Sequence, residues 1–363
     1  MRRLQKLLPL LGAIVCLLLL GPGLALTFRG ITDFIDLYAG AKLTFTGDQY
    51  NVARVLATEA HFTGYSSPTR LFMRLPVFGL LLWPLAQVPY LSASAIWESL
   101  CALAIASFPW IWPGRKRIWT ITACCWSLPV WMTLAEGQDV AFLLLWLALA
   151  ILALRKQRPI LSGLLLSLCA AKFHLFLLLP IWLVLNRLWR VGAGVAIGGA
   201  LLITASFLAG GVAWPQHYFD LLREPANNPY PDLMPNVHSL FGGIAIALVA
   251  ILAMRKLNAP SGLAVVLIGG ILIAPHDYMA DCALILPAAL LLLERNQPAL
   301  TRGLLLLLLT PVPYVALMLH ASSVLTVPMI AAITILAFFR PYEESTQPQF
   351  EQCPSAGAHS PAL

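Results

Sequence analysis

Residues 161–186 read LSGLLLSLCAAKFHLFLLLPIWLVLN, an apolar run interrupted at its centre by Lys172 and His174. Basic residues flank this run on both sides: Arg155, Lys156 and Arg158 precede it, and Arg187 and Arg190 follow it. Because Lys and Arg gather on the cytoplasmic side of membrane proteins, both ends of the run are expected on that side. Each half has about 13 residues and reaches only about 20 Å as a helix, less than a bilayer core of about 30 Å. The run therefore predicts a short helical hairpin that carries Lys172 to an outward-facing cavity.

The composition extends this interpretation to the whole chain. Of the 363 residues, 60% are hydrophobic and 11% are charged, and the mean hydropathy is +0.81. Soluble domains have roughly 45–50% apolar and 25% charged residues, so these values exclude an ordinary soluble enzyme, a disordered protein and a disulfide scaffold. The apolar runs are continuous, unlike the alternating segments of a β-barrel. We therefore predict an all-α, polytopic transmembrane helical bundle.

The basic clusters give the predicted topology. If every cluster is cytoplasmic, the chain forms about twelve membrane segments with both termini in the cytoplasm. The segments are 7–26, 91–113, 118–135, 139–154, 160–172, 174–186, 191–209, 238–254, 261–274, 282–294, 303–319 and 324–339. The first run also has the form of a signal peptide, but an uncleaved span agrees better with the remaining membrane segments. The net charge of +7 is attributed to the cytoplasmic loops, and no nucleic acid is expected as a partner.

Residues 1–340 are predicted to form one transmembrane domain with two long extracytoplasmic loops. The first loop covers 27–90 and is expected to hold juxtamembrane helices, one of which, over 71–88, lies in or dips into the outer leaflet. The second loop covers 210–237. The polar, Pro- and Ser-rich tail over 341–363 is expected to be disordered and cytoplasmic.

Ionisable side chains gather on the predicted extracytoplasmic side. Asp33 and Asp36 are three residues apart, so on a helix they share one face, and a carboxylate held there can act as a general base. A solvated polar face of a juxtamembrane helix is the alternative. Further polar residues are expected to line a cavity on this side: Tyr38, Tyr50, Arg74, Gln138, Asp139, Lys172, His174, His238, His276, Asp277, Tyr278 and Asp281. The chain has no Cys or His cluster of metal-ligand spacing and no nucleotide fingerprint, so neither a metal nor a cofactor is predicted.

The order of short motifs along the chain resembles glycosyltransferase family 87, whose best-known members are polyprenyl-phosphate-mannose-dependent α-mannosyltransferases. The matching stretches are 33–34, 38–41, 47–50, 72–76, 84–86, 88–89, 136–138, 162–172 and 275–281. The chain departs from the family pattern at Arg74-Leu75-Pro76, where Tyr-Pro-Pro is usual, at Asp139, where the turn usually has Asn, and at Phe173, where Pro is usual.

The resemblance implies a GT-C fold with its active site at the extracytoplasmic face and a lipid-phosphate-linked sugar as donor. Asp33 matches the acid expected to act as base, with Asp36 as the second choice. By the same analogy, Lys172 would lie near the donor phosphate, where His174 and Arg74 would also offset its charge.

The sequence thus leads to the hypothesis of a bacterial cytoplasmic-membrane enzyme that moves a sugar from a polyprenyl-phosphate donor to a lipid or glycan acceptor. The expected partners are this donor, the acceptor and membrane lipids. A secondary transporter or lipid flippase is the first alternative, although no inverted repeat is evident. A non-catalytic membrane scaffold is the second, and it predicts that Asp33 tolerates substitution.

Overall fold

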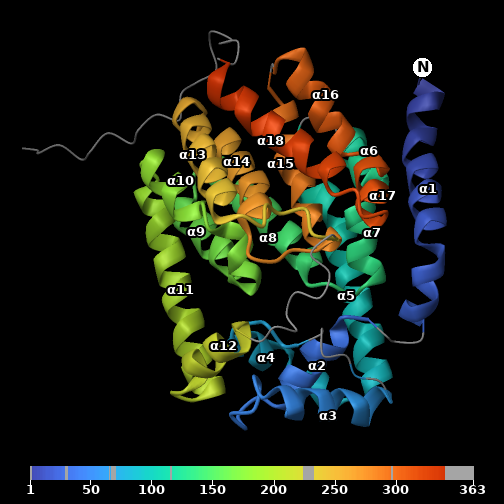
Figure 1. The fold of residues 1–363 in the computed structure, drawn as a ribbon, viewed down its shortest axis with the longest axis vertical. Helices are drawn as coiled ribbons and strands as arrows, with labels where there is room; N and C mark the ends of the chain where they lie inside the picture. The colour runs from blue at the N-terminus through green and yellow to red at the C-terminus, as the bar shows by residue number, and fades with distance from the viewer. Residues whose placement is uncertain are drawn as a thin grey trace, which may run out of the picture.

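The computed structural model describes residues 2–28, 32–64, 66, 71–114, 117–223, 233–295 and 297–339. The predicted tail over 341–363 and residues 224–232 of the second predicted loop lie outside the described residues. Within the described ranges all regular structure is helical and no strand occurs, which confirms the all-α prediction. The ribbon forms a helical bundle with a separate layer of short helices at one end (Figure 1).

The bundle helices follow the predicted segments closely. They are α1 (Arg2–Phe28), α5 (Tyr90–Ile111), α6 (Arg117–Trp126), α7 (Leu128–Ala135), α8 (Val140–Arg155), α9 (Pro159–Ser167), the 3-10 segment η2 (Leu168–Phe176), α10 (Leu179–Leu185), α11 (Trp189–Gly210), α13 (Leu240–Lys256), α14 (Ala259–Ile273), the 3-10 segment η5 (Met279–Leu284), α15 (Ile285–Leu293), α16 (Ala299–Leu308), α17 (Val312–Met318) and α18 (Ser323–Phe338). The most completely buried of them is α14, around which the core of the bundle is packed.

Few of these helices are long enough to cross a bilayer as single straight elements. Among the described residues, three helical stretches have the length and hydropathy for it, namely α5, the continuous run of α9 and η2, and α11. The number becomes five if α6 with α7, bent by 64°, and α16 with α17, bent by 53°, each form one span. Pro129 and Pro313 lie in the first turns after these bends, where a missing backbone N–H is tolerated. The count of twelve crossings stays a prediction.

The end layer consists of α2 (Phe34–Lys42), α3 (Val52–Thr63), α4 (Pro76–Leu82) and α12 (Trp214–Leu222), which lie together at the bottom of Figure 1. Residues 71–88, predicted as one helix, instead form an extended segment, then α4, and then the short 3-10 turn η1 (Leu85–Gln87). Tyr50 after α2 and Tyr218 of α12 meet edge to face with ring centroids 5.3 Å apart, which ties two parts of the layer together.

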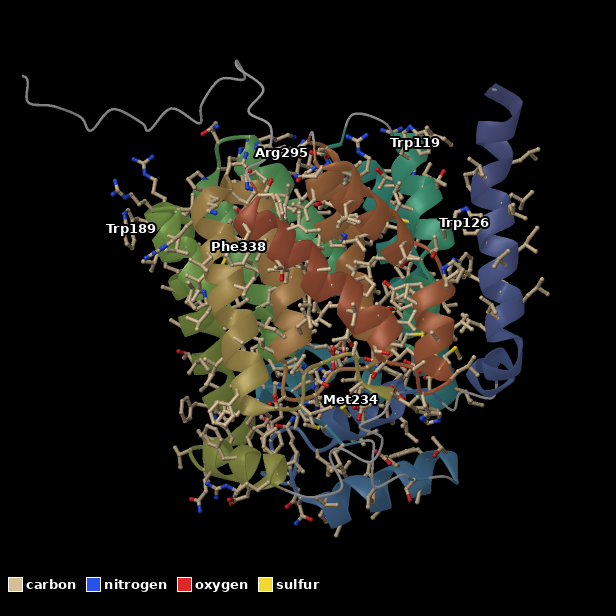
Figure 2. The ribbon with its side chains drawn as sticks, turned by 45° about the horizontal axis from the view of Figure 1, so that its top comes forward. Trp119, Trp126, Trp189, Met234, Arg295 and Phe338 are labelled. Carbon is tan, nitrogen blue, oxygen red and sulfur yellow. The ribbon has the colours of Figure 1, made fainter. Side chains whose placement is uncertain are left out.

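Basic residues lie at the opposite end of the bundle, called here the basic end. They are Arg117, Arg155, Lys156, Arg158, Arg187, Arg190, Arg255, Lys256 and Arg295, all at or next to helix termini. Figure 2 shows Trp119, Trp189 and Arg295 toward this end and Met234 farther toward the end layer. The separation of basic loops from the end layer is the pattern on which the topology was predicted.

Two helices of the bundle cross in close contact. A Cβ atom on Gly163 of α9 would come within 2.1 Å of the carbonyl of Val191, and one on Gly194 of α11 within 2.2 Å of the carbonyl of Ile160. Such backbone contact between small residues is a common way of packing helices in membranes. It fixes α9, and with it the η2 segment that carries Lys172, against α11.

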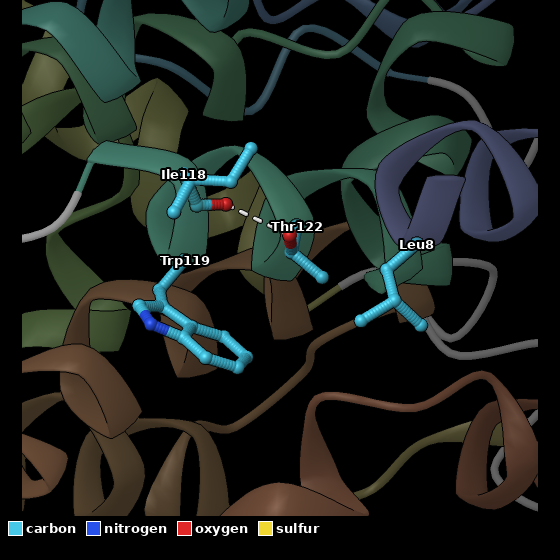
Figure 3. A pocket seen from close by; sticks show the side chains of 4 residues that line it. All are labelled: Leu8, Ile118, Trp119 and Thr122. Atoms are coloured by element: carbon cyan, nitrogen blue, oxygen red, sulfur yellow. Dashed lines mark hydrogen bonds between the residues drawn. The ribbon is translucent and has the colours of Figure 1, made fainter. Parts of the chain in front are cut away.

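The first helix packs on the outside of the bundle (Figure 1). The indole N–H of Trp126 in α6 donates to the carbonyl of Leu8 at 3.0 Å. The Trp126 ring packs against Gly12 of α1, where a Cβ atom would come within 2.5 Å of it. A shallow depression between the two helices is lined by Leu8, Ile118, Trp119 and Thr122 (Figure 3). It lies near the basic end, because α6 begins there, and its only drawn polar contact is internal to α6, from Thr122 to the carbonyl of Ile118 at 2.7 Å.

Candidate functional site

A network of charged and amide side chains lies where the bundle meets the end layer. Its members are Asp33 before α2, Arg74 before α4, Gln138 and Asp139 in the turn between α7 and α8, Lys172 in η2, and Asp281 in η5. Up to 248 positions separate these residues along the chain, from Asp33 to Asp281. All six were candidates from the sequence, and the structure brings them into one cluster.

Lys172 is at the centre of the network. The backbone there leaves helical geometry, with φ −130° and ψ 59°, at the break that the sequence predicted between the two halves of its apolar run. The side chain is 5% exposed. Its Nζ donates to Oδ1 of Asp281 at 2.6 Å and to Oε1 of Gln138 at 2.9 Å. Asp281 is held in turn by the backbone N–H of Tyr278, which donates to Oδ2 at 3.0 Å.

Arg74 and Asp139 form a bidentate ion pair. Nε of Arg74 donates to Oδ2 of Asp139 at 2.6 Å, and a second guanidinium nitrogen donates to Oδ1 at 3.1 Å. The Tyr50 hydroxyl donates to the Arg74 carbonyl at 2.7 Å and so fixes the extended segment that carries the arginine. Although burial alone would raise the pKa of Asp139, the charges of Arg74 and Lys172 hold it below its usual value. Asp139 is therefore ionised throughout the physiological range.

Asp33 is held by the turn that follows α7. Its backbone N–H donates to the carbonyl of Glu136 at 2.8 Å, and its carboxylate accepts a short hydrogen bond from the amide of Gln138. Gly137 in this turn has φ +62°, a conformation that favours glycine. The indole N–H of Trp97 donates to the Gly137 carbonyl at 2.7 Å. Asp33 occupies the N-cap position of α2, but its side chain does not make the capping hydrogen bond.

Two further carboxyl groups beside the network are buried and have raised pKa values. Burial raises the pKa of Asp36 well above its ordinary value, and the nearby charge of Asp33 raises it further. Burial likewise raises the pKa of Asp277, with the charge of Asp281 acting in the same direction. Both side chains are less than a tenth exposed. Their burial keeps Asp36 and Asp277 from reaching an acceptor hydroxyl, so both are poorer candidates for the base than an exposed carboxylate.

Two imidazoles stack next to Lys172. The ring centroids of His174 and His276 are 4.3 Å apart and the planes differ by 30°. Burial, the largest effect, lowers the pKa of His276 to about 4, and the positive charge of Lys172 also lowers it. His276 is neutral at pH 7, so it presents an imidazole rather than a cation to the network.

The remaining candidates lie at the edge of the network or away from it. The Tyr38 hydroxyl donates to the carbonyl of Val88 at 2.9 Å, and its ring packs edge to face on Tyr90 of α5, so Tyr38 joins the end layer to the bundle. Tyr278 contributes its backbone N–H to Asp281. His238 is exposed just before α13.

Trp97 and Tyr218 were not among the predicted site residues. Trp97 supports the turn that carries Gln138, and Tyr218 packs against Tyr50, which holds the Arg74 segment. Neither residue stands in a recognisable motif. Aromatic residues are common in membrane segments and loops, so no local signal distinguishes these two from the rest.

The charges within the network nearly balance. Two cations, Arg74 and Lys172, face two carboxylates, Asp139 and Asp281, and Asp33 adds a third carboxylate. Such a cluster combines a carboxylate able to accept a proton with cations able to face a developing negative charge.

Comparison with known proteins identifies a family for this chain. The model of glycosyltransferase family 87 matches residues 72–311, about two thirds of the chain. The matched region includes Arg74, Gln138, Asp139, Lys172 and Asp281. Asp33 precedes it. Neither a curated protein nor a solved structure matches the chain.

Proposed function

The chain belongs to glycosyltransferase family 87 and is a membrane glycosyltransferase, and we propose that it moves a sugar from a polyprenyl-phosphate donor to a lipid or glycan acceptor. The observation that carries this proposal is the buried network in which the Asp33 carboxylate, the Lys172 ammonium and the Arg74 guanidinium meet at one end of an apolar bundle. An apolar bundle suits a lipid-linked donor, and the network supplies both a base and cations at a single place.

Asp33 is the base in this proposal. It is partly exposed, whereas Asp36 and Asp277 are buried with raised pKa values. A base must accept a proton from a hydroxyl within about 2.6–3.2 Å, which requires a carboxylate that the acceptor can reach. Among the acids of this region, these properties favour Asp33 over Asp36.

The reaction balances as a single displacement. Asp33 takes the proton of the acceptor hydroxyl, and the hydroxyl oxygen forms a bond to the anomeric carbon of the sugar. The bond between that carbon and the donor phosphate oxygen breaks, and the polyprenyl phosphate leaves with the bonding electron pair. Attack from the side opposite the phosphate inverts the anomeric configuration.

Arg74 and Lys172 are the proposed partners of the departing phosphate. Each is already paired with a carboxylate, so phosphate binding requires that Asp139 or Asp281 shares its cation. The neutral His276 and its stacked neighbour His174 can contribute hydrogen bonds but no full charge. The cations would offset the charge that builds up on the leaving phosphate.

The proposed location is the extracytoplasmic face of a bacterial cytoplasmic membrane, with both termini in the cytoplasm. The basic residues at the end opposite the network support this orientation, because basic loops favour the cytoplasm. The polyprenyl chain would then lie in the outer leaflet, beside the apolar surface of the bundle.

Sugar transfer in vesicles tests the proposal. Purified protein is reconstituted with a membrane lipid extract and a panel of radiolabelled polyprenyl-phosphate sugars, beginning with mannose. Wild type is compared with Asp33→Asn and with Asp48→Asn, a control in the first loop whose side chain is 36% exposed in a surface ion pair with Arg54. Labelled product from wild type and Asp48→Asn, with only a small residual rate from Asp33→Asn, is the expected result.

The alternatives predict other outcomes. Equal product from wild type and Asp33→Asn would retain the transferase and move the base to another residue. Movement of the labelled lipid between leaflets without a new product would favour a transporter or flippase. If the protein shows neither activity, although the same acceptor extract supports another transferase, the result would favour a scaffold.

A further inference from the structure

The amide of Gln138 joins the two functional ends of the network. Its Nε2 donates to Oδ2 of Asp33, and its Oε1 accepts from Nζ of Lys172 at 2.9 Å. The side chain is 7% exposed, so water competes little for either contact. One side chain therefore links the proposed base to the cation that faces the donor phosphate.

The direction of this link is fixed by chemistry. An ammonium group has three donors and no acceptor, so the amide oxygen of Gln138 must face Lys172. Its NH₂ group must then face Asp33, and the Asp33 oxygen must accept. An amide that is free at both ends can turn over, but this one cannot without placing two donors against each other. Lys172 thus presents the Gln138 amide to Asp33 as a donor.

The backbone of Gln138 is held as firmly as its side chain. Its N–H donates to the carbonyl of Thr133 at 2.9 Å, and the carbonyl of the preceding Gly137 accepts from Trp97 at 2.7 Å. These contacts anchor the amide to α5 and α7 of the bundle. The Asp33 backbone is bonded to the carbonyl of Glu136 in the same turn, so the Gln138 hydrogen bond adds the contact that orients the Asp33 carboxylate.

We propose that Gln138 is a positioning residue for sugar transfer, whose amide, oriented by Lys172, holds the Asp33 carboxylate in the orientation that receives the acceptor proton. This inference rests on the proposed function. A purely structural role, in which Gln138 only satisfies the ammonium of Lys172, is the competing explanation. Positioning depends on the NH₂ group that donates to Asp33, whereas the structural role depends only on the oxygen that accepts from Lys172.

Two substitutions separate the ends. Gln138→Glu keeps an oxygen acceptor for Lys172 and removes the donor to Asp33, whereas Gln138→Met removes both contacts at similar size. Gln87→Met is the matched control, because Gln87 is exposed on η1 in the end layer and makes only a local contact to the carbonyl of Trp83. Initial rates are measured in the vesicle assay over a range of donor concentration, for single variants and in the Asp33→Asn background.

Positioning predicts that kcat falls on the order of 10- to 100-fold in both Gln138 variants, the range expected for a hydrogen bond to a charged group, while the KM for donor changes little. It also predicts that Gln138→Glu adds no further loss to the residual rate of Asp33→Asn, because the residue acts through Asp33. Gln87→Met should match wild type.

Wild-type kcat in Gln138→Glu would overturn the inference and leave Gln138 as a partner of Lys172 alone. A rise in KM with unchanged kcat would also overturn it, in favour of a donor-binding role. An additive further loss in the Asp33→Asn background would do the same. A lack of transfer by wild type with every donor would count against the proposed function itself, and the inference would fall with it.

Discussion

The buried ion pair of Arg74 and Asp139 allows a quantitative test of how the network is held together. Both side chains are less than a tenth exposed, and the pair has two hydrogen bonds. Asp139→Asn leaves the buried Arg74 guanidinium without its paired carboxylate. Removing one partner of a buried pair costs about 3–5 kcal/mol, because the remaining charge is uncompensated. For a chain of this size, that loss lowers the melting temperature on the order of 10 °C.

The structure also predicts the order of the variants. Arg74→Met leaves Asp139 with Lys172, whose Nζ is 3.7 Å from Oδ1, so it should cost less than Asp139→Asn. The double variant removes one charge of each sign and restores the balance of the cluster. We therefore expect it to recover most of the loss, with a coupling energy of at least about 2 kcal/mol between the two sites. Sugar transfer should not recover with it, because the arginine is absent.

Thermal unfolding in detergent, followed by tryptophan fluorescence, measures these differences, and the 11 tryptophans give a strong signal. Asp48→Asn is the control, since it breaks an exposed ion pair worth less than about 1 kcal/mol. Losses for the two single variants that add in the double variant to within about 0.5 kcal/mol would refute the reasoning, because residues that act as a pair are not additive. So would an Asp139→Asn variant as stable as Asp48→Asn.

Three further predictions concern the packing and protonation of the same region. Lys172→Met should lower the melting temperature far more than Lys156→Met. The first variant leaves the buried Asp281 carboxylate without its cation, whereas the second removes an exposed lysine at the basic end. Equal melting temperatures would contradict this. Gly163→Leu should prevent monodisperse elution in detergent, since its Cβ would meet the α11 backbone, whereas Gly192→Leu has open space and should elute like wild type. The pKa of His276 is lowered from 6.5 to about 4, so between these pH values the folded state binds fewer protons than the unfolded state. Neutral His276 therefore contributes about 3 kcal/mol to the free energy of unfolding above pH 6.5, and this contribution should be lost as the pH falls toward 4. His276→Gln should remove that part of the pH dependence of the melting temperature, and an unchanged pH dependence would show that another group is responsible.

The fold class and most helix positions could be predicted from the sequence because they depend on local quantities. Apolar runs bounded by basic residues define the bundle helices, and the break at Lys172 follows from a charged residue inside such a run. The end layer was harder to predict, since residues 71–88 are apolar enough for a helix. Pro76 starts α4 and the segment before it is extended, held by the Tyr50 hydroxyl from a distant part of the chain.

The candidate site was predictable as a set of residues but not as a network. The sequence indicated that Asp33, Arg74, Asp139 and Lys172 belong on one side of the bundle, because charges are costly within a bilayer and gather where they find partners. It assigned Arg74 and Lys172 to a phosphate and did not predict that each is paired with a carboxylate. Ion pairing depends on which turns meet, and the turns that meet here are far apart in the chain.

The sequence by itself determined that this chain is an apolar helical bundle with polar residues gathered at one end, because hydropathy and the distribution of basic residues act locally along the chain. The tertiary structure alone decided which carboxylates are buried and how their pKa values are shifted. Asp33 stays partly exposed beside the Gln138 amide, while burial raises the pKa of Asp36 three residues later. The physical reason is that protonation depends on desolvation and on neighbouring charges, and both are properties of the folded packing rather than of sequence position.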